Sequence, residues 1–434
     1  MNPLTRPLPS PPETLRRGPL REGRFTSRLH DPRVASLLGI WLGIAFGTCF
    51  ATGLVSHFMQ HPPSWFSWPS RPVWFYRFTQ GLHVATGLAS VPLLLAKLWT
   101  VYPRLWEWPP VRTVAHALER ISIIVLIGGA LFQLSTGIAN IAQWYPFHFF
   151  FTVAHYWAAW VTIGALLVHV AAKLTVVRAN VGRGRLHDVA LEGVALTGVA
   201  LVDVTLVDVT LEGFDPDGGD LEPGGVPVRR SSPEPDGDGL SRRGFVGAVG
   251  AAAGVITVVT AGQAVPGLSE LDLLAPRKPT VGPQNLPVNR TAAAAGVATV
   301  ARDPGYRLEV VGPRPLRLSL ADLAAFPQAT SHLPITCVEG WSADATWSGV
   351  ALPQLLDRAG IPHDATVRVE SLESGSLYSM SEVRPPHARD PLTLLATGLR
   401  GEPLALDHGY PVRLIAPNRP GVLQTKWVHR VVML

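Results

Sequence analysis

Five long apolar stretches divide the chain into parts of very different character. Four of them lie at 34–56, 80–101, 121–142 and 149–177, and the fifth covers 245–265. A helix needs about 20 mostly apolar residues to cross a bilayer, and stretches this long and this free of charge are atypical of buried helices in soluble proteins. The pattern therefore predicts a four-helix membrane bundle and one further membrane-spanning helix.

The composition agrees with a chain that lies partly in lipid. Of its 434 residues, 47% are hydrophobic and only 16% are charged, whereas a soluble protein has about 25% charged residues. This apolar content excludes a largely disordered chain. The chain has only two cysteines, Cys49 and Cys337, which excludes a disulfide-rich scaffold and any cysteine-rich metal site.

Basic residues mark one side of the predicted membrane helices. The arm at 1–33 is rich in arginine, and Lys and Arg also follow the second and fourth helices. The opposite loops carry only Arg71 and Arg77. Because Lys and Arg concentrate in cytoplasmic loops, we expect a cytoplasmic N-terminus. This topology accounts for the net charge of +5, so we expect no nucleic-acid partner.

A polar segment at 179–240 separates the bundle from the fifth helix, and we expect it to be a cytoplasmic linker. Residues 189–213 repeat every five positions (VALEG, VALTG, VALVD, VTLVD, VTLEG). This repeat is compatible either with a pentapeptide-type coil or with a low-complexity spacer. Residues 215–239 are rich in Gly, Pro and Asp, which indicates disorder.

The segment 241–265 opens with the sequence Ser-Arg-Arg-Gly-Phe. Twin arginines before an Ala/Gly-rich apolar helix resemble a signal for the twin-arginine translocase. An ordinary positive flank of a membrane helix would look similar. In either case we expect this helix to run outward and to place residues 280–434 on the extracytoplasmic side of the cell membrane.

Histidines occur inside the apolar stretches, where ionisable residues are rare and usually functional. From the topology, His57, His83 and His155 lie toward the outer side, and His116 and His169 lie toward the inner side. His155 and His169 are fourteen residues apart, which puts them on nearly the same helix face about 21 Å apart.

Two b-type haems need axial imidazoles from different helices that converge inside a bundle. We expect His83 to pair with His155 and His116 with His169, with His57 as a possible outer ligand. Alternatively, these histidines bond between helices or bind quinone. The placement of histidines in residues 34–178 resembles that in the four-helix di-haem cytochromes b of hydrogenases and formate dehydrogenases. This resemblance implies that the four-helix domain exchanges electrons with membrane quinone. Ion transport is a further alternative, for which Glu119 is the one acidic candidate.

From about residue 280 the pattern predicts a soluble α+β domain. Short β-rich runs at 306–311, 366–369 and 412–415 alternate with helical segments at 319–325 and 353–359. Cys337 follows an apolar run and has polar and aromatic neighbours. Cys337 could therefore be a metal ligand, a nucleophile or an inert core residue. No histidine lies in a sequence context typical of a cysteine protease.

Three motifs in this domain resemble the sulfite-oxidase-type molybdenum fold. They are CVEGWS around Cys337, TWSGVALPQLLDRAG at 346–360 and DHGYPVRLIAPNRPGVLQTKWV at 407–428. The first is especially similar to the catalytic subunits of periplasmic methionine-sulfoxide reductases. The resemblance covers about 286–434 and implies a molybdopterin-dependent oxidoreductase.

The resemblance implies that the Cys337 thiolate ligates molybdenum, which a pterin dithiolene also holds. A soft thiolate suits such a metal, and Arg and Lys suit the pterin phosphate. By position, a polar ring around this Mo-molybdopterin consists of Asn289, Arg290, Glu373, His408, Arg413, Gln424, Thr425 and Lys426.

The expected substrate follows from one departure from the family pattern. Sulfite oxidases follow the cysteine with Asn-Arg-Arg, whereas this chain has Glu339, Gly340 and Trp341. A glutamate would repel sulfite. We therefore expect electrons to move from quinol through the haems to molybdenum, where a small S-oxide or N-oxide such as methionine sulfoxide loses its oxygen. Oxidation of a sulfite-like substrate with reversed electron flow is one alternative, and a non-catalytic haem anchor or sensor is another.

Overall fold

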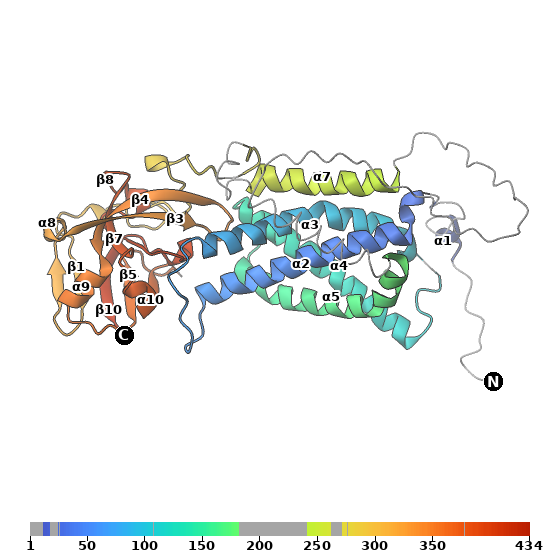
Figure 1. The fold of residues 1–434 in the computed structure, drawn as a ribbon, viewed down its shortest axis with the longest axis horizontal. Helices are drawn as coiled ribbons and strands as arrows, with labels where there is room; N and C mark the ends of the chain where they lie inside the picture. The colour runs from blue at the N-terminus through green and yellow to red at the C-terminus, as the bar shows by residue number, and fades with distance from the viewer. Residues whose placement is uncertain are drawn as a thin grey trace, which may run out of the picture.

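The computed structural model describes residues 12–17, 25, 27–106, 108–181, 241–261, 271–275, 277–376 and 378–434. A helical part and a β-rich part lie end to end along the long axis of the molecule (Figure 1). The five-residue repeat at 189–213 and the segment at 215–239, predicted to be disordered, lie outside the described residues.

Five helices of the N-terminal part are long and apolar enough to cross a membrane, which confirms the prediction from the apolar stretches. Their bounds are α2 Pro32–Gln60, α3 Phe75–Leu105, α4 Val114–Ile141, α5 Phe151–Val181 and α7 Arg242–Ala261. The short helices α1 Glu13–Arg17 and η2 Arg28–His30 precede them. Helix α2 packs against α3 and α5, α4 packs against α5, and α7 lies along α3 (Figure 1).

Hydroxyl side chains inside these helices hydrogen-bond to the helices' own backbone. Thr86 donates to the carbonyl of Leu82 at 2.8 Å, and Ser90 donates to the carbonyl of Thr86 at 2.7 Å. Such bonds to the preceding turn satisfy a polar group without a partner helix. The polar residues of α3 are therefore compatible with an apolar environment.

The C-terminal part contains two five-stranded sheets, as expected for an α+β domain. The first has the order β2-β1-β10-β5-β6, and the second has β3-β4-β7-β8 with β9 also paired to β7. Among the described strands, only β1 and β10 pair in parallel. The strands are β1 Leu308–Val311, β2 Leu316–Leu318, β3 Gln328–Thr336, β4 Ser342–Ala351, β5 Val367–Ser371, β6 Met380–Val383, β7 Leu394–Leu399, β8 Glu402–Pro403, β9 Arg413–Ile415 and β10 Val428–Met433.

Short helices connect these strands. The α-helices are α8 Leu320–Ala325, α9 Leu352–Arg358 and α10 Pro385–Ala388, and the 3-10 turns are η5 Pro283–Asn285, η6 Val300–Arg302, η7 Leu406–His408 and η8 Gly421–Leu423. The main core joins the two sheets through residues that are fully buried, such as Leu308 of β1, Leu355 of α9 and Leu395 of β7. Removing such side chains from water is the main stabilisation of the domain.

The hairpin of β3 and β4 carries Cys337 in its turn. The two strands pair in antiparallel register up to Thr336 opposite Ser342. The turn closes with a hydrogen bond from the Cys337 amide to the Trp341 carbonyl at 2.9 Å. Gly340 in this turn has φ +97°, a conformation that glycine adopts without the strain a side chain would add. The hairpin therefore holds Cys337 at a defined end of the β-rich part, close to α3 (Figure 1).

Polar contacts join the β-rich part to the helical part around this hairpin. Arg71 pairs with the buried carboxylate of Asp390 at 3.1 Å, and Arg77 pairs with Asp344 at 2.8 Å. The Asn418 side chain accepts a hydrogen bond from the Tyr76 amide at the start of α3 at 2.9 Å. These contacts fix the turn that carries Cys337 against the end of the helical part.

Candidate functional site

A cavity of about 600 Å³ lies between the β-rich part and the helical part, and Cys337 lines it. Seven of the eight polar residues that the sequence assigns to the cofactor site also line it. These are Asn289, Arg290, Glu373, Arg413, Gln424, Thr425 and Lys426. Residues separated by more than a hundred positions in the chain thus come together around one thiol.

The Cys337 thiol is buried and receives one directed hydrogen bond. Asn289 donates its side-chain amide to Sγ at 2.9 Å, and the Trp341 indole donates to the Asn289 oxygen at 3.3 Å. Burial raises the pKa of the Cys337 thiol, and the nearby Glu339 carboxylate raises it further. A thiolate at this position therefore needs a positive charge beside it, such as a bound metal supplies.

Arg413 supplies a buried cation without full compensation. Its guanidinium donates to the His408 carbonyl at 3.1 Å and lies 5.2 Å from the Trp347 ring centre. Its Nε atom is buried and finds no hydrogen-bond partner among the described residues. Burial lowers the pKa of Arg413 to about 9. An unpaired buried cation is unfavourable unless an anion accompanies it, so this side chain fits an anionic ligand.

Lys426 adds a second cation to the same wall. Its amine donates to the backbone carbonyls of Arg290 and Asp407, each at 2.8 Å. Burial, together with the charge of Arg413, lowers the pKa of Lys426 to about 7. An anionic ligand would restore the charged form of the amine.

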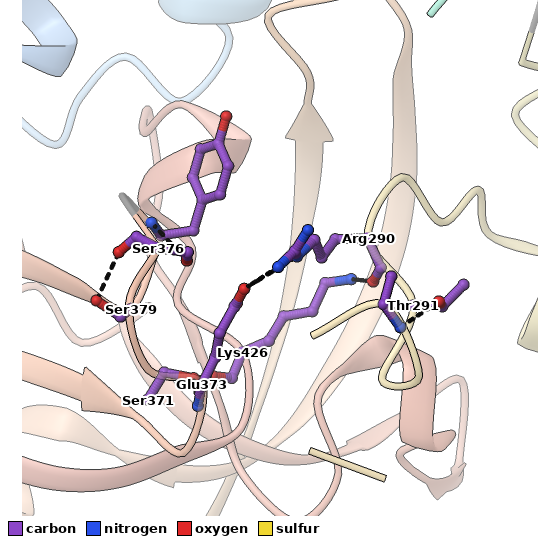
Figure 2. A network of polar contacts seen from close by, with 9 residues as sticks. Arg290, Thr291, Ser371, Glu373, Ser376, Ser379 and Lys426 are labelled. Atoms are coloured by element: carbon purple, nitrogen blue, oxygen red, sulfur yellow. Dashed lines mark hydrogen bonds and ion pairs between the residues drawn. The ribbon is translucent and has the colours of Figure 1, made fainter. Parts of the chain in front are cut away.

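An ion pair borders this wall. Figure 2 shows the Arg290 guanidinium turned toward the Glu373 carboxylate, with the Lys426 amine reaching the Arg290 backbone. The Arg290–Glu373 distance is 2.6 Å, and Glu373 is almost fully buried. The Glu373 amide donates to the Ser371 hydroxyl at 3.0 Å, which fixes the carboxylate. The pair orients Arg290 without neutralising Arg413 or Lys426.

Three of the predicted residues, His408, Gln424 and Thr425, hydrogen-bond to backbone groups or side chains around the cavity. His408 does not line the cavity, because its Nε2 donates to the Pro283 carbonyl at 2.7 Å while its own carbonyl holds Arg413. Burial lowers the pKa of His408 to about 4, so it is neutral. The Gln424 amide pairs with both backbone groups of Ala416 at 2.8 Å. The Thr425 hydroxyl bonds to that of Ser381 at 2.7 Å.

The opposite wall comes from the helical part, and sequence reasoning missed it. The connection between α4 and α5 contributes Gln143, Tyr145, Phe147, Phe149 and Phe150. Gln143 donates to both oxygens of Glu339 at 2.8 Å and accepts a hydrogen bond from Arg277. Burial raises the pKa of Glu339. The run of aromatic residues after the third apolar stretch is the sequence feature from which this wall could have been predicted.

A second cavity of about 580 Å³ lies inside the helical part. His83 of α3 and His155 of α5 line it, with ring centres 6.4 Å apart. His83 Nδ1 contacts the Cys49 carbonyl at 2.8 Å, and a carbonyl only accepts, so Nδ1 carries the proton. His155 Nδ1 likewise contacts Thr136 at 2.8 Å, whose hydroxyl donates to the Phe132 carbonyl. Both Nε2 atoms therefore have a lone pair available for a metal.

The surroundings of this pair fit a flat metal complex. The ring-centre distance of 6.4 Å would allow both imidazoles to reach one metal ion with bonds of about 2 Å. Small residues lie beside both rings. A Cβ atom added to Gly53 would lie 3.0 Å from the His83 ring, and one added to Gly137 would lie 3.8 Å from the His155 ring. His57 lines the same cavity and stacks on Tyr156 at 3.8 Å.

The structure does not bring the two inner histidines into contact. His116 Nδ1 accepts a hydrogen bond from the Arg112 amide at 3.2 Å. His169 Nδ1 is buried without a hydrogen-bond partner among the described residues. No ring contact joins His116 and His169 in this part of the chain. The pairing of His116 with His169 stays a prediction, whereas the His83 and His155 rings are 6.4 Å apart in an edge-to-face arrangement.

The two cavities share a wall. Val338, the neighbour of Cys337, lines both of them, as do Asn140, Phe151 and Thr152. Within the described ranges, no group of three or more His, Cys, Asp or Glu side chains converges. The candidate metal ligands are therefore one cysteine on one side of the shared wall and a histidine pair on the other.

The cationic wall generates a prediction about anion binding. Sulfate keeps its charge near neutral pH, whereas Lys426, with its pKa lowered to about 7, loses its charge as the pH rises through 7. Cofactor-free protein should bind sulfate most tightly below pH 7 and lose more than about tenfold in affinity by pH 9, since a charge-assisted hydrogen bond contributes about 1.5–3 kcal/mol. Titration calorimetry measures this dependence.

Two variants control the sulfate experiment. Lys426→Gln should bind weakly with little change over the same pH range, while Lys278→Gln, which alters an exposed lysine, should behave like the unaltered chain. An identical pH profile in Lys426→Gln would show that this amine does not hold the anion.

Comparison with known proteins agrees with this geometry. Residues 295–434 match the family model "Oxidoreductase molybdopterin binding domain". The chain is 32% identical over 146 residues to the protein-methionine-sulfoxide reductase catalytic subunit MsrP of Gluconobacter oxydans (strain 621H), which covers 30% of this chain and 47% of the relative. It is 33% identical over 156 residues to mitochondrial sulfite oxidase of Mus musculus, covering 29% of this chain and 28% of the relative.

A third relative is the uncharacterized oxidoreductase YuiH of Bacillus subtilis (strain 168), 31% identical over 136 residues, with 29% of this chain and 64% of the relative covered. The chain thus spans less than two thirds of each of these relatives. The family match covers Cys337 and the motifs at 346–360 and 407–428. The C-terminal part of this chain is a molybdopterin-binding oxidoreductase domain related to methionine-sulfoxide reductases and sulfite oxidases.

Proposed function

We propose that this chain is a membrane-bound oxidoreductase that reduces an S-oxide or N-oxide, such as methionine sulfoxide, with electrons from membrane quinol. The observation that carries the proposal is the shared wall between two cavities. One cavity has a free thiol beside unneutralised cations, and the other has two facing imidazoles. Each arrangement fits one redox group, and the wall brings the two groups close together.

The residues present fit a molybdenum–pterin group in the Cys337 cavity. Cys337 would ligate the metal with Asn289 holding the thiolate, and Arg413 and Lys426 would bind the anionic pterin phosphate. When bound, this group supplies oxygen-atom transfer. The chain's own contribution would be to bury the thiolate, to hold it with the Asn289 amide and to exclude water from the site.

In the helical part, His83 and His155 would hold an iron porphyrin, which supplies one-electron chemistry when bound. The Cys49 carbonyl and the Thr136 hydroxyl fix both imidazoles with Nε2 toward the cavity. We propose a second haem with His116 and His169 as ligands, which would need the two side chains to approach each other. His57 is the alternative ligand at the outer level.

The charge around the substrate side favours a neutral S-oxide over sulfite. The Glu339 carboxylate lines the Cys337 cavity, where it would repel a sulfite anion. Aromatic side chains between α4 and α5 give the same cavity an apolar wall. In the overall reaction, one sulfoxide and one quinol give one sulfide, one water and one quinone. Two electrons and two protons leave the quinol, and both protons end in the water.

We place the molybdopterin-binding domain on the extracytoplasmic side of the cell membrane. The basic flanks of the helices support this orientation through the positive-inside bias. Arg242 begins α7 and pairs with Asp31 before α2 at 3.0 Å. We further propose that Arg242 and Arg243 direct the folded domain to the twin-arginine translocase, because a cofactor inserted in the cytoplasm requires export in the folded state.

Sulfite oxidation with reversed electron flow is the second candidate. Its specific support is the sulfite oxidase similarity over 156 residues. Glu339 argues against it, since Gln143, which itself accepts a hydrogen bond from Arg277, holds the Glu339 carboxylate. The two candidates differ in their substrate and in the direction of electron flow.

A substrate panel tests the proposed function. Purified protein from a host that makes the cofactor should contain molybdenum and reoxidise a reduced dye with methionine sulfoxide or other sulfoxides, but not reduce an oxidised dye with sulfite. Cys337→Ser should lose the metal and fall in turnover by more than about a hundredfold, because the removed group ligates the metal. Absence of molybdenum, or turnover of sulfite alone, would refute the proposal.

Single histidine substitutions test the haem assignment. His155→Leu and His169→Leu should each remove one b-type haem, because an axial ligand is lost from the outer and the inner site respectively. The haem-to-protein ratio from the reduced-minus-oxidised spectrum measures the result. The exposed His148 offers a matched control, since His148→Leu should keep both haems. If His155→Leu retained the full spectrum, the ligand pair would be wrong.

A further inference from the structure

The turn that carries Cys337 rests directly on helix α3. A Cβ atom added to Gly340 would lie 2.6 Å from a methyl group of Val84, which is closer than side chains can approach. Val84 follows His83 in the chain. Because Gly340 has no side chain, the turn can lie directly against the Val84 side chain of α3, next to His83.

A buried glutamine crosses this contact. Gln80 of α3 is 3% exposed, and its side-chain nitrogen donates to the Val338 carbonyl at 2.8 Å. Its oxygen accepts a hydrogen bond from Ser56 of α2 at 3.1 Å, which fixes the orientation of the amide. Gln80 lies three residues before His83, on the same face of α3. One side chain therefore links the helix that carries His83 to the turn that carries Cys337.

Val338 connects the hydrogen bond from Gln80 to Cys337 through the chain. The peptide bond between Cys337 and Val338 leads covalently from the Val338 carbonyl to the cysteine. A route through covalent bonds and one short hydrogen bond couples two redox sites better than a route across van der Waals gaps. Asn140 reaches the same carbonyl at 3.4 Å, beyond the usual range of such bonds. The other shared wall residues, Phe151 and Thr152, make no hydrogen bond to Val338 among the described contacts.

We infer that the hydrogen bond between Gln80 and Val338 is the contact through which the histidine-pair site and the Cys337 site exchange electrons. Gln80 is thus a positioning residue that sets the coupling between the two sites. The inference rests on the proposed function. Each S-oxide reduced takes two electrons and two protons and yields a sulfide and water, so the contact is used twice for every oxygen atom removed.

A single-turnover experiment measures electron transfer through this contact. The haem of the complete protein is reduced without oxygen, methionine sulfoxide is added, and the haem absorbance is followed as the haem is reoxidised. Gln80→Met keeps the length of the side chain and removes the donor, so it should slow reoxidation at least tenfold. The haem spectrum and the dye-driven turnover at the Cys337 site should stay unchanged, because neither depends on this hydrogen bond.

Two further variants distinguish a loss of electron transfer between the two sites from a loss of contact between the turn and α3. Asn140→Leu removes the long contact to the same carbonyl and should slow reoxidation less than threefold. Gly340→Ala places a methyl group against Val84 and should lift the turn from α3. Amide hydrogen exchange at residues 338–340 of molybdenum-free protein should therefore rise in Gly340→Ala and stay unchanged in Gln80→Met.

Each outcome decides between the possibilities. Reoxidation in Gln80→Met within twofold of the unaltered chain would overturn the inference, as would an equal loss in Asn140→Leu. If Gln80→Met also raised amide exchange, Gln80 would hold the turn against α3 and the inference would be wrong.

If the unaltered protein turned over sulfoxide with the dye but never reoxidised its haem, the electron route of the proposed function would fail instead. If Gln80→Met lost its haem, Gln80→Leu would be measured against the same thresholds.

Discussion

The close contact between Gly340 and Val84 is the constraint on which the rest of the site depends. Any side chain at position 340 would separate the turn of the β3–β4 hairpin from helix α3. With glycine there, the hairpin brings Cys337 to the end of the helical part, and the neighbouring Val338 becomes a wall of both cavities. The position of one thiol relative to two imidazoles thus depends on this contact between the turn and the Val84 side chain, which the ion pairs of Arg71 and Arg77 reinforce.

Charge is arranged to complement this geometry. Besides Arg290, which pairs with Glu373, the Cys337 cavity carries the cations Arg413 and Lys426, whose pKa values are lowered by burial. The neighbouring Glu339 is held by Gln143 of the helical part. Cations on one wall favour an anionic cofactor, and a carboxylate beside the thiol disfavours an anionic substrate. Both parts of the chain thus contribute charged or polar groups to this one cavity.

Much of this organisation could be predicted from the sequence, because it depends on local patterns. The apolar stretches predicted the five helices, and the motifs around Cys337 and Arg413 predicted the domain. The resemblance to the molybdenum family, applied position by position, named seven residues that line one cavity. His408 lies one layer behind the cavity surface, which its motif does not reveal, because its ring donates to the distant Pro283. Gln80 and Gln143 were missed because their partners, Val338 and Glu339, lie 258 and 196 positions away in the chain. No local pattern encodes such contacts.

The central claim is that one chain carries two redox sites that exchange electrons across a shared wall. The most direct test is the rate at which the reduced haem of detergent-solubilised protein is reoxidised by methionine sulfoxide, measured over a hundredfold range of protein concentration. Transfer within one chain predicts a first-order rate that does not change with concentration. A rate that rises in proportion to protein concentration would show transfer between molecules and would contradict the account.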